Sequence, residues 1–398
     1  MNESDWINLA DQVIANTYKR FPVVFESGQG AVLTDVEGRA YVDFVAGIAV
    51  CNLGHANQGV ADALAAQAKK LFHVSNLFYT TPQAELAQWL VDHSFADRVF
   101  FCNSGAEANE AAIKLARKNF FDKGNYNRWR IIAMEQSFHG RTYATLSATG
   151  QKKVREGFEP ILEGFDFVPF NDIDALAANV SEKTCAVLLE LIQGEGGVLC
   201  ASPEYIKAAR RLCDETGAIL IFDEIQTGMG RTGKLFAYEH YGVAPDIMTL
   251  AKALGNGLPI GAMLAMEDVV RAFTPGSHAS TFGGTPVITA AALEVVRQME
   301  RDDILASCRE TGAYFKERLT ALKDRHDVIA DVRGVGLMLG MRLKTAGAPI
   351  VEACMKKGYL INCTQETILR FIPPLVITRA QVDGLIACLD DIFSNTHT

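Results

Sequence analysis

The sequence predicts an α/β protein with a mostly parallel sheet in a large domain and a smaller domain of α+β type. Between about residues 97 and 270, short apolar runs alternate with amphipathic helical stretches, which is typical of repeated strand-helix-strand units. The chain has 398 residues, of which 49% are hydrophobic, so it can bury a large core and form two domains. We expect the large domain at 56–295 and the small domain from 1–55 together with 296–398.

The individual elements follow from these patterns in chain order. A hairpin is expected at 30–45, with Asp35, Glu37 and Gly38 at the turn between two short apolar runs. Six later apolar runs predict the strands of the large domain, at 98–102, 130–134, 185–191, 218–222, 247–251 and 262–266. A long helix at about 286–320 and strands near 336–343 and 369–371 are expected to complete the small domain.

Composition limits the class of partner. The net charge of −9 and the isoelectric point near 5.5 argue against binding to nucleic acid or to a membrane surface, since both need a basic face. We therefore expect small-molecule partners. Nine cysteines are scattered without a Cys-x-x-Cys pair or metal-ligand spacing, so no metal site is expected. No run approaches the roughly 18 apolar residues of a membrane span, and no basic leader is visible, so the sequence suggests a cytoplasmic protein.

Two chemically active side chains are expected at the ends of buried strands. Asp223 ends one apolar run, and Lys252 ends another that lies about one strand-helix-strand unit later. In a parallel sheet both would emerge at the carboxyl edge, where ligands bind. Desolvation there would lower the pKa of the lysine and free its amine as a nucleophile toward a carbonyl carbon. A lone lysine at such a position is more often a solvated strand end, so the interpretation depends on its neighbours.

A helix N-terminus is predicted at the same edge of the sheet. Ser104 can cap the helix, Gly105 permits close approach, and strong helix formers continue through Arg117. The unpaired amides and the helix dipole would bind an anion such as phosphate. Taken alone, the segment also fits a capped helix that binds nothing.

These groups together match the needs of pyridoxal 5′-phosphate (PLP). The cofactor requires an anchor for its phosphate, a partner for its ring nitrogen and an amine for its aldehyde. Asp223 would keep the ring nitrogen protonated, and Phe138 and Ile225 would stack on the two faces of the ring. Either apolar residue, taken alone, would more often be part of the core.

Seven motifs resemble, in the same order along the chain, those of the class III aminotransferases of fold type I. The resemblance covers nearly the whole chain, and it implies a PLP-dependent aminotransferase of that fold. Within the family it is nearest to enzymes that use N-acetylornithine and 2-oxoglutarate in arginine biosynthesis, with enzymes for N-succinylornithine close beside them. The motifs are SGAEANEAAIKLAR (104–117), SFHGRT (137–142), QGEGGV (193–198), LIFDEIQTGMGRTG (220–233), LAKALGNGLPIGAML (250–264), HASTFGG (278–284) and LRFIPPL (369–375).

The resemblance implies a role for each matching residue around the cofactor. Lys252 would be the Schiff-base lysine and proton shuttle, and Asp223 would hold the pyridine nitrogen. Gln226 would reach the phenolic oxygen of the ring. Thr281 of the partner subunit would reach the phosphate, which implies a homodimer with shared active sites. The rest of the phosphate site would be Ser104, Gly105 and Ala106.

The resemblance also implies how two differently shaped substrates share one pocket. Arg370 would bind the α-carboxylate of glutamate and would be masked by Glu195 when N-acetylornithine is bound, which avoids a bare buried charge. Arg141 would bind the distal carboxylate of either substrate, because its planar fork suits bidentate pairing. Ser280 would hydrogen-bond the acyl-amino end. Ile48 occupies a position where enzymes for free ornithine carry a tyrosine, which favours an acylated donor but does not exclude 4-aminobutyrate.

Other interpretations stay open at this point. A PLP aminomutase would need no 2-oxoglutarate, and the expected pairing of Glu195 with Arg370 argues against it. A non-catalytic PLP-binding regulator would need a nucleic-acid-binding module, which the sequence does not show. No role is assigned to Glu190, His55 or His139, although a hydrogen-bonded structural role is expected for each histidine.

Overall fold

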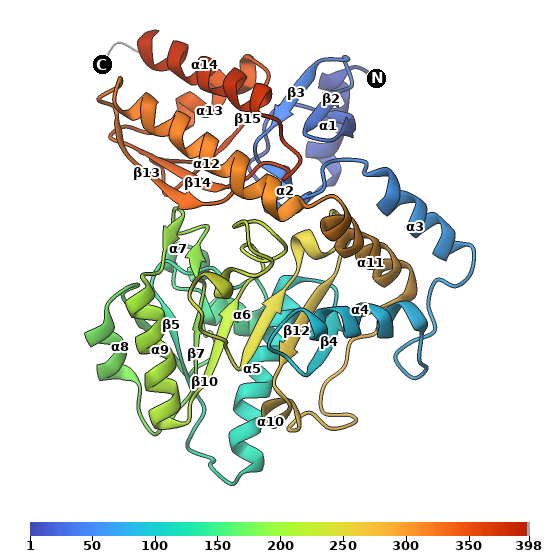
Figure 1. Ribbon diagram of the computed structural model, residues 1–398, viewed down its shortest axis with the longest axis vertical. Helices are drawn as coiled ribbons and strands as arrows, with labels where there is room; N and C mark the ends of the chain where they lie inside the picture. The colour runs from blue at the N-terminus through green and yellow to red at the C-terminus, as the bar shows by residue number, and fades with distance from the viewer. Residues whose placement is uncertain (396–398) are drawn as a thin grey trace.

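A seven-stranded sheet forms the centre of the computed structural model, which describes residues 1–395 (Figure 1). The strand order is β4-β12-β11-β10-β7-β5-β6. β12 is antiparallel to both of its neighbours, whereas the other strands share one direction, so their carboxyl ends meet at a single edge. The strands are β4 Arg98–Cys102, β5 Arg130–Met134, β6 Phe165–Val168, β7 Thr184–Leu189, β10 Ile219–Asp223, β11 Ile247–Leu250 and β12 Gly261–Ala265.

Both faces of this sheet are buried under helices. Successive side chains of a strand point to opposite faces, so a strand covered on both sides reads as a continuous apolar run. On β10, Ile219 and Ile221 pack in one apolar cluster with residues of helix α5 (Gly105–Asp122). Leu220 belongs to the cluster on the opposite face, together with residues of α9 (Pro203–Thr216). This arrangement is the mostly parallel α/β sheet that the sequence predicts.

Segments from the two ends of the chain lie side by side in a second region, at the top of Figure 1. They are linked by parallel pairing between β3 and β15. One sheet has the order β1-β2-β3-β15 and another the order β13-β14-β17-β16. The domain limits at 56 and 295 stay a prediction. The strands are β1 Phe25–Gln29, β2 Val32–Asp35, β3 Ala40–Asp43, β13 Ile329–Val335, β14 Met338–Leu343, β15 Tyr359–Leu360, β16 Asn362–Thr364 and β17 Ile368–Phe371.

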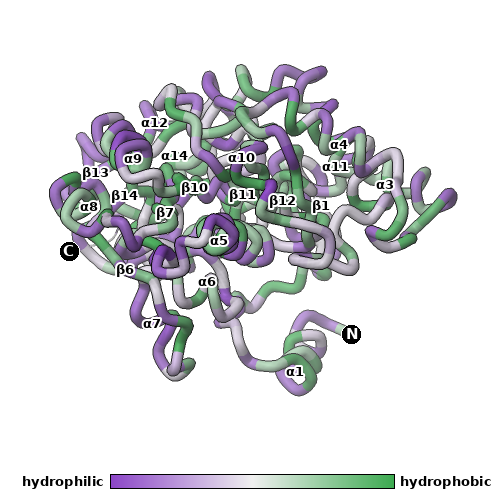
Figure 2. Tube along the Cα trace, turned by 90° about the horizontal axis from the view of Figure 1, so that it is seen from below, coloured by the Kyte–Doolittle hydropathy of each residue, from purple (hydrophilic) through white to green (hydrophobic). Residues whose placement is uncertain are grey.

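The remaining elements cover the sheets or connect them. Hydrophobic positions concentrate toward the centre of the molecule, and α1 stands away from the body (Figure 2). None of the helices in residues 1–395 combines the length and apolar character needed to cross a membrane. The helices are α1 Glu3–Val13, α2 Ala46–Ala49, α3 Gln58–Ala68, α4 Thr81–Asp92, α6 Tyr143–Ala148, α7 Lys152–Arg155, α8 Ile173–Asn179, α10 Glu267–Val270, α11 Pro286–Arg301, α12 Ile304–Lys323, α13 Ala348–Lys356 and α14 Arg379–Asn395, and a small hairpin is formed by β8 Ile192–Gln193 and β9 Leu199–Cys200.

The strand predictions need three corrections. The strand expected at 185–191 ends at Leu189, because Leu191 is buried in the core without taking part in the ladder. β12 is antiparallel because only residues 251–260 join it to β11, whereas a parallel crossover needs roughly a dozen residues or more. In residues 1–395, seven further strands were not expected from the sequence: β1, β6, β8, β9, β13, β15 and β16. The expected hairpin is confirmed by the antiparallel pairing of β2 and β3.

The long helix expected at 286–320 is wrong, because two helices occupy this region. α11 ends at Arg301 and α12 begins at Ile304, with Asp302 and Asp303 between them. Asp303 has a φ of 45°, which lies in the left-handed region and is incompatible with a continuous helix. Aspartate side chains favour helix ends over helix interiors because they compete for nearby backbone N–H groups.

Candidate active site

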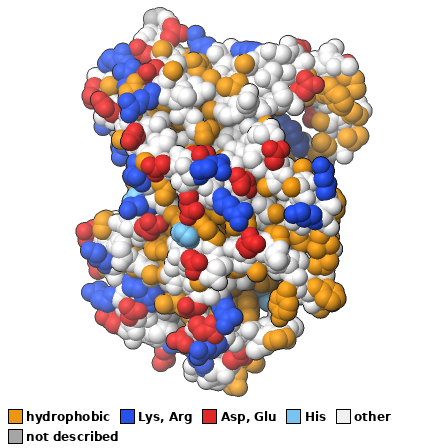
Figure 3. Space-filling view, turned by 45° about the vertical axis from the view of Figure 1, so that its right-hand side comes forward, with side chains coloured by type: hydrophobic (Ala, Val, Ile, Leu, Met, Phe, Trp, Pro, Cys, Tyr) orange, Lys and Arg blue, Asp and Glu red, His pale blue; other side chains and the backbone are white. Residues whose placement is uncertain are grey.

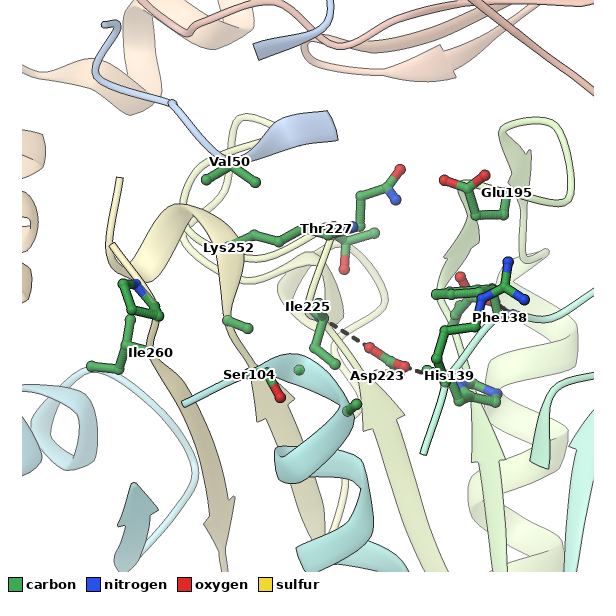
Figure 4. A pocket seen from close by; sticks show the side chains of 18 of the residues that line it. Val50, Ser104, Phe138, His139, Glu195, Asp223, Ile225, Thr227, Lys252 and Ile260 are labelled. Atoms are coloured by element: carbon green, nitrogen blue, oxygen red, sulfur yellow. Dashed lines mark hydrogen bonds and ion pairs between the residues drawn. The ribbon is translucent and has the colours of Figure 1, made fainter. Parts of the chain in front are cut away.

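A cavity of about 470 Å³ lies at the carboxyl edge of the large sheet, where several parallel strands end together. Its wall includes Asp223 at the end of β10 and Lys252 just after β11. Ser104, which follows β4, and Phe138, which follows β5, also line it. Figure 4 shows these side chains around one space. The topology therefore brings together residues that are far apart in the sequence, as the parallel arrangement predicts.

Lys252 presents its amine to this cavity from a strained backbone position. It begins a short 3₁₀ turn, Lys252–Leu254, and its φ of 45° lies in the left-handed region, which is rare for a residue other than glycine. Within residues 1–395 its amine has no hydrogen-bond or ion-pair partner. Burial, aided by the charge of Arg370, lowers the pKa of Lys252 to about 8 against the opposing effect of Glu195. A substantial fraction of the amine is therefore uncharged near pH 8.

Asp223 is a buried carboxylate that its neighbours hold in place. Its Oδ2 accepts hydrogen bonds of 2.8 Å from Nδ2 of Asn109 and from Nδ1 of His139, and its Oδ1 accepts one of 3.1 Å from the backbone N–H of Ile225. The bonds from His139 and Ile225 are drawn in Figure 4. The N–H groups of Asn109 and Ile225 donate to this carboxyl group, and Nδ1 of His139 lies at hydrogen-bond distance from it. The site therefore offers a fixed negative charge for a protonated nitrogen.

The N-terminus of α5 forms an anion cradle on another wall. The side chain of Ser104 accepts a hydrogen bond of 3.2 Å from the N–H of Glu107, as the sequence predicts for a capping residue. The N–H groups of Gly105 and Ala106 precede the first helical hydrogen bond and have no intrahelical acceptor. A Cβ atom at Gly105 would lie 2.8 Å from Cδ1 of Ile225, so only glycine leaves the Ile225 side chain in its present position.

The remaining walls combine apolar and polar side chains. Phe138 and Ile225 line the cavity, and the guanidinium of Arg141 lies 5.6 Å from the centre of the Phe138 ring. Arg141 is exposed, and no carboxylate pairs with it within the described part of the chain. Gln226 is buried, and its Oε1 is 3.5 Å from a guanidinium nitrogen of Arg370. The donor set and the apolar walls fit PLP, because each part of that cofactor has a chemically matching group.

Glu195 lines the cavity and forms an ion pair with Arg370, with 2.6 Å between its Oε1 and Nη1 of the arginine. Only 1% of Arg370 is exposed, whereas 30% of the Glu195 side chain is exposed, so the carboxylate is the more movable partner. Burial alone would raise the pKa of Glu195, but the guanidinium outweighs it and holds that pKa below its usual value. Nε of Arg370 also donates to Oδ1 of Asn362 at 3.2 Å, which helps to fix the arginine.

Besides Arg370, three residues singled out by the sequence do not line this cavity in the single chain. Ser280 and Thr281 line a neighbouring cavity of about 350 Å³, which shares Asn103 with the first. The hydroxyl of Ser280 accepts hydrogen bonds from Asn103 at 3.2 Å and from the N–H of Gly283 at 3.0 Å. Ile48 is 42% exposed and does not border the cavity. The roles expected for Ser280 and Thr281 therefore stay predictions that require a second subunit.

Sequence reasoning missed one residue and left others without a role. Asn109 is fully buried and donates to both Asp223 and the carbonyl of His139. Its position one turn after Gly105, on the helix face toward the sheet, is the signal that could have identified it. His139 is buried and hydrogen-bonded to Asp223, as expected for a structural histidine. Glu190 is buried in the wall, where its Oε2 accepts the N–H of Phe138 at 3.1 Å.

His55 lies away from the cavity lining and is held by Asp43. Its Nε2 is 2.7 Å from Oδ2 of Asp43. The hydrogen bond to Asp43 raises the pKa of His55 to about 9, although burial opposes this effect. The histidine is therefore charged at neutral pH and contributes to structure, in agreement with the role that the sequence analysis favours.

Sequence comparisons identify close relatives over the whole chain. The profile of the class III aminotransferases matches residues 13–393. A protein of Methanocaldococcus jannaschii named acetylornithine aminotransferase is 48% identical over 397 residues, which is 99% of each chain. A protein of the same name from Caldanaerobacter subterraneus subsp. tengcongensis is 49% identical and covers 98% of this chain and 99% of its own.

Solved structures show the same architecture. The ornithine aminotransferase of Toxoplasma gondii ME49 is similar with a TM-score of 0.96 and 32% identity, covering 99% of this chain and 95% of that one. A further structure of that enzyme has PLP at partial occupancy at its active site. The acetylornithine aminotransferase of Elizabethkingia anophelis is similar with a TM-score of 0.89 and 32% identity, covering 99% of both chains.

Proposed function

The chain belongs to the class III aminotransferases, and we propose that it transfers the terminal amine of N-acetylornithine to 2-oxoglutarate. The products would be N-acetylglutamate 5-semialdehyde and glutamate, in a step of arginine biosynthesis. Membership of this family makes the chain a PLP-dependent aminotransferase of fold type I. The substrates and the residue roles that follow are our proposals.

The cavity residues would hold PLP by groups that match its parts. The N–H groups of Gly105 and Ala106 would bind the phosphate together with Ser104, and the carboxylate of Asp223 would hold a proton on the pyridine nitrogen. The side chains of Phe138 and Ile225 would cover the two faces of the ring. When bound, PLP supplies an electron sink that stabilises negative charge on the carbon bearing the substrate amine.

Lys252 would supply both the nucleophile and the proton carrier. Its uncharged amine can attack a carbonyl carbon, and its pKa near 8 lets Nζ accept and release a proton close to neutral pH. Gln226, which lies beside Arg370 in the cavity, would reach the phenolic oxygen of the cofactor. These assignments place the proton transfers at Nζ of Lys252.

The ion pair between Arg370 and Glu195 would let one cavity accept two substrates. With N-acetylornithine bound, a neutral carbon chain lies near the reacting amine, and Glu195 keeps the buried guanidinium paired. With glutamate or 2-oxoglutarate bound, the α-carboxylate would replace Glu195, whose partly exposed side chain can move away. Arg141, which pairs with no carboxylate within residues 1–395, would bind the distal carboxylate of either substrate.

This substrate proposal is supported by the relatives that are named acetylornithine aminotransferase. Alternative donors are free ornithine, because the Toxoplasma structure is an ornithine aminotransferase, as well as N-succinylornithine and 4-aminobutyrate. The pairing of Arg370 with Glu195 favours a two-substrate reaction over an aminomutase.

We also propose a homodimer in the cytoplasm, with active sites shared between subunits. Large apolar side chains are exposed on the segment between α3 and α4 and on the loop before α11 (Figure 3). Tyr79 is fully exposed and Phe282 is 62% exposed, which is unusual for a surface that contacts only water. Ser280 and Thr281 lie on the same loop as Phe282. If a partner subunit binds at this surface, these two residues would lie near the partner's cavity.

A half-reaction experiment tests the proposed donor. The PLP-loaded protein is mixed separately with N-acetylornithine, N-succinylornithine, ornithine and 4-aminobutyrate, and the loss of the cofactor absorbance is followed. We expect the fastest loss with N-acetylornithine and its reversal by 2-oxoglutarate. Faster loss with another amine would overturn the substrate but keep the enzyme class. The Lys252→Ala variant is the control and should show no loss with any amine.

A further inference from the structure

A second buried carboxyl group stands beside Asp223 in the cavity wall. Asp223 ends β10, and Glu190 directly follows β7, which is the parallel neighbour of β10. In the register of these strands Leu189 lies opposite Phe222, so Glu190 and Asp223 take the next opposed positions at the sheet edge. Glu190 is 6% exposed and Asp223 is 4% exposed. Two carboxyl groups on opposed positions of neighbouring strands, both poorly solvated, cannot both be ionised without a large cost.

The hydrogen bonds decide which of the two carries the charge. Asp223 accepts three N–H donors, two of them from the side chains of Asn109 and His139. Among the residues that the structure describes, Glu190 accepts a single donor, the backbone N–H of Phe138, at 3.1 Å. Since each donated hydrogen bond stabilises the ionised form, Glu190 has less support for a negative charge than its neighbour.

The charges around Glu190 do not compensate for its smaller number of hydrogen-bond donors. Burial raises the pKa of Glu190 well above its usual value, and the carboxylates of Asp223 and Glu195 raise it further. Lys252 is the cation that acts in the other direction, but its own pKa is lowered to about 8. The guanidinium of Arg370 is already paired with Glu195.

We propose that Glu190 is uncharged when cofactor and substrate bind, and that its neutral carboxyl group positions Phe138 while Asp223 alone of the two carries negative charge. Glu190 is thus a positioning residue. It anchors the backbone of Phe138, which forms a wall of the cavity, without placing another anion near Lys252. An ionised Glu190 would raise the pKa of Lys252 and reduce the fraction of nucleophilic amine. The benefit to catalysis rests on the proposed function, whereas the protonation state does not.

The protonation state is measured directly by infrared spectroscopy of the protein without PLP at pH 8. We expect a carboxylic acid C=O band in the wild type that disappears in Glu190→Gln. Glu224→Gln is the matched control, since Glu224 is also buried but has a pKa of only about 7 and is mostly ionised at pH 8. The control should keep the band. Loss of the band in the control, or its persistence in Glu190→Gln, would overturn the proposal.

The reactivity of Lys252 gives a second, independent measurement. The cofactor-free protein is labelled with an amine-reactive reagent over a range of pH, and labelling at Lys252 is followed by peptide mass spectrometry. If Glu190 is neutral, Glu190→Gln leaves the apparent pKa of Lys252 within about half a pH unit of the wild type. If Glu190 is ionised, removing its charge lowers that pKa by about one unit or more, and the proposal is wrong. Neither measurement depends on transamination, so a wrong substrate assignment leaves both results interpretable.

The positioning role is tested by PLP affinity. Glu190→Gln keeps an acceptor for the N–H of Phe138 and stays neutral, so its dissociation constant for PLP should stay within about threefold of the wild type. Glu190→Ala removes the acceptor and should weaken PLP binding by roughly tenfold or more. Equal losses in both variants would contradict a neutral positioning group, because only a role for the charge predicts that glutamine fails.

Discussion

At the scale of single residues, the environment of Lys252 decides its chemistry. Its backbone is held in the left-handed region, and its amine faces the cavity without a partner within residues 1–395. Strained positions of this kind persist only where the surrounding structure determines them. Asp223 shows the opposite arrangement, with three donors that hold one carboxylate in place. The site therefore combines a lysine amine that no described residue binds with a carboxyl group that hydrogen bonds hold in place.

The lowered pKa of Lys252 predicts how PLP loading depends on pH. The uncharged amine is the reactive form, so a pKa lowered from 10.5 to about 8 makes this form abundant at a lower pH. The rate at which the cofactor-free protein takes up PLP covalently should therefore rise through pH 8 and level off above it. Stopped-flow absorbance measures this rate. A rate that still rises steeply at pH 10 would show that the pKa of Lys252 is not lowered.

The ion pair of Arg370 predicts unequal effects on the two half-reactions. Arg370→Ala should lower the rate constant with glutamate by about 100-fold, on the order of 3 kcal/mol, because two charge-assisted hydrogen bonds to its α-carboxylate are lost. The half-reaction with N-acetylornithine should be affected much less. Transient kinetics of each half-reaction measures both values, and Arg297→Ala, at an exposed ion pair, is the control. Equal losses would rule out the exchange of Glu195 for substrate.

At the scale of elements, the first turn of α5 must approach Ile225 closely. Gly105→Ala would place a Cβ atom 2.8 Å from Cδ1 and 2.9 Å from Cγ2 of that side chain. Ile225 would have to move into the space that we assign to the cofactor ring. Overpacking of this kind costs about 1–3 kcal/mol, so PLP affinity should fall by roughly tenfold.

Fluorescence titration with PLP measures the effect of Gly105→Ala. The double variant with Ile225→Val removes the Cδ1 atom and should recover part of the affinity, whereas Ile225→Val alone should change it little. An unchanged affinity in Gly105→Ala would show that the cofactor does not lie between these two residues.

Several elements could be predicted from the sequence because a single local signal determines each of them. The strand that ends at Asp223 and the strand before Lys252 are mostly apolar runs, and the helix after Ser104 has a capping residue and strong helix formers. The break between α11 and α12 was not predicted, although the spacing of buried positions changes there from Met299 to Ile304, across the two aspartates. The direction of β12 depends on the length of a loop and not on the strand itself.

At the scale of the whole molecule, the sheet topology assembles the site. Residues that follow β4, β5, β7, β10 and β11 meet at one edge because these strands run in the same direction. The sequence motifs identified most of these residues but could not give the distances between them. They did not indicate Asn109, whose contact with Asp223 depends on how α5 packs against the sheet. The position of Ser280 and Thr281 outside the cavity could not be predicted either, because it depends on the fold of a surface loop.

The exposed apolar surface predicts a dimer. Light scattering coupled to size exclusion should give twice the chain mass of 43.4 kDa. Phe78→Glu combined with Tyr79→Glu should produce monomers, since both side chains are exposed and would be buried in the interface. The monomers should also bind PLP more weakly, because Thr281 of the partner subunit would be absent. A wild-type monomer with full PLP affinity would contradict shared active sites.

The assignment of the active site is tested most directly by locating the covalently bound cofactor. The PLP-loaded protein is reduced with borohydride and digested, and the labelled peptide is sequenced by mass spectrometry. We expect the label on Lys252, at the carboxyl edge of the sheet beside Asp223. A label on any other lysine, or no label after loading with PLP, would contradict the assignment of this cavity as the active site.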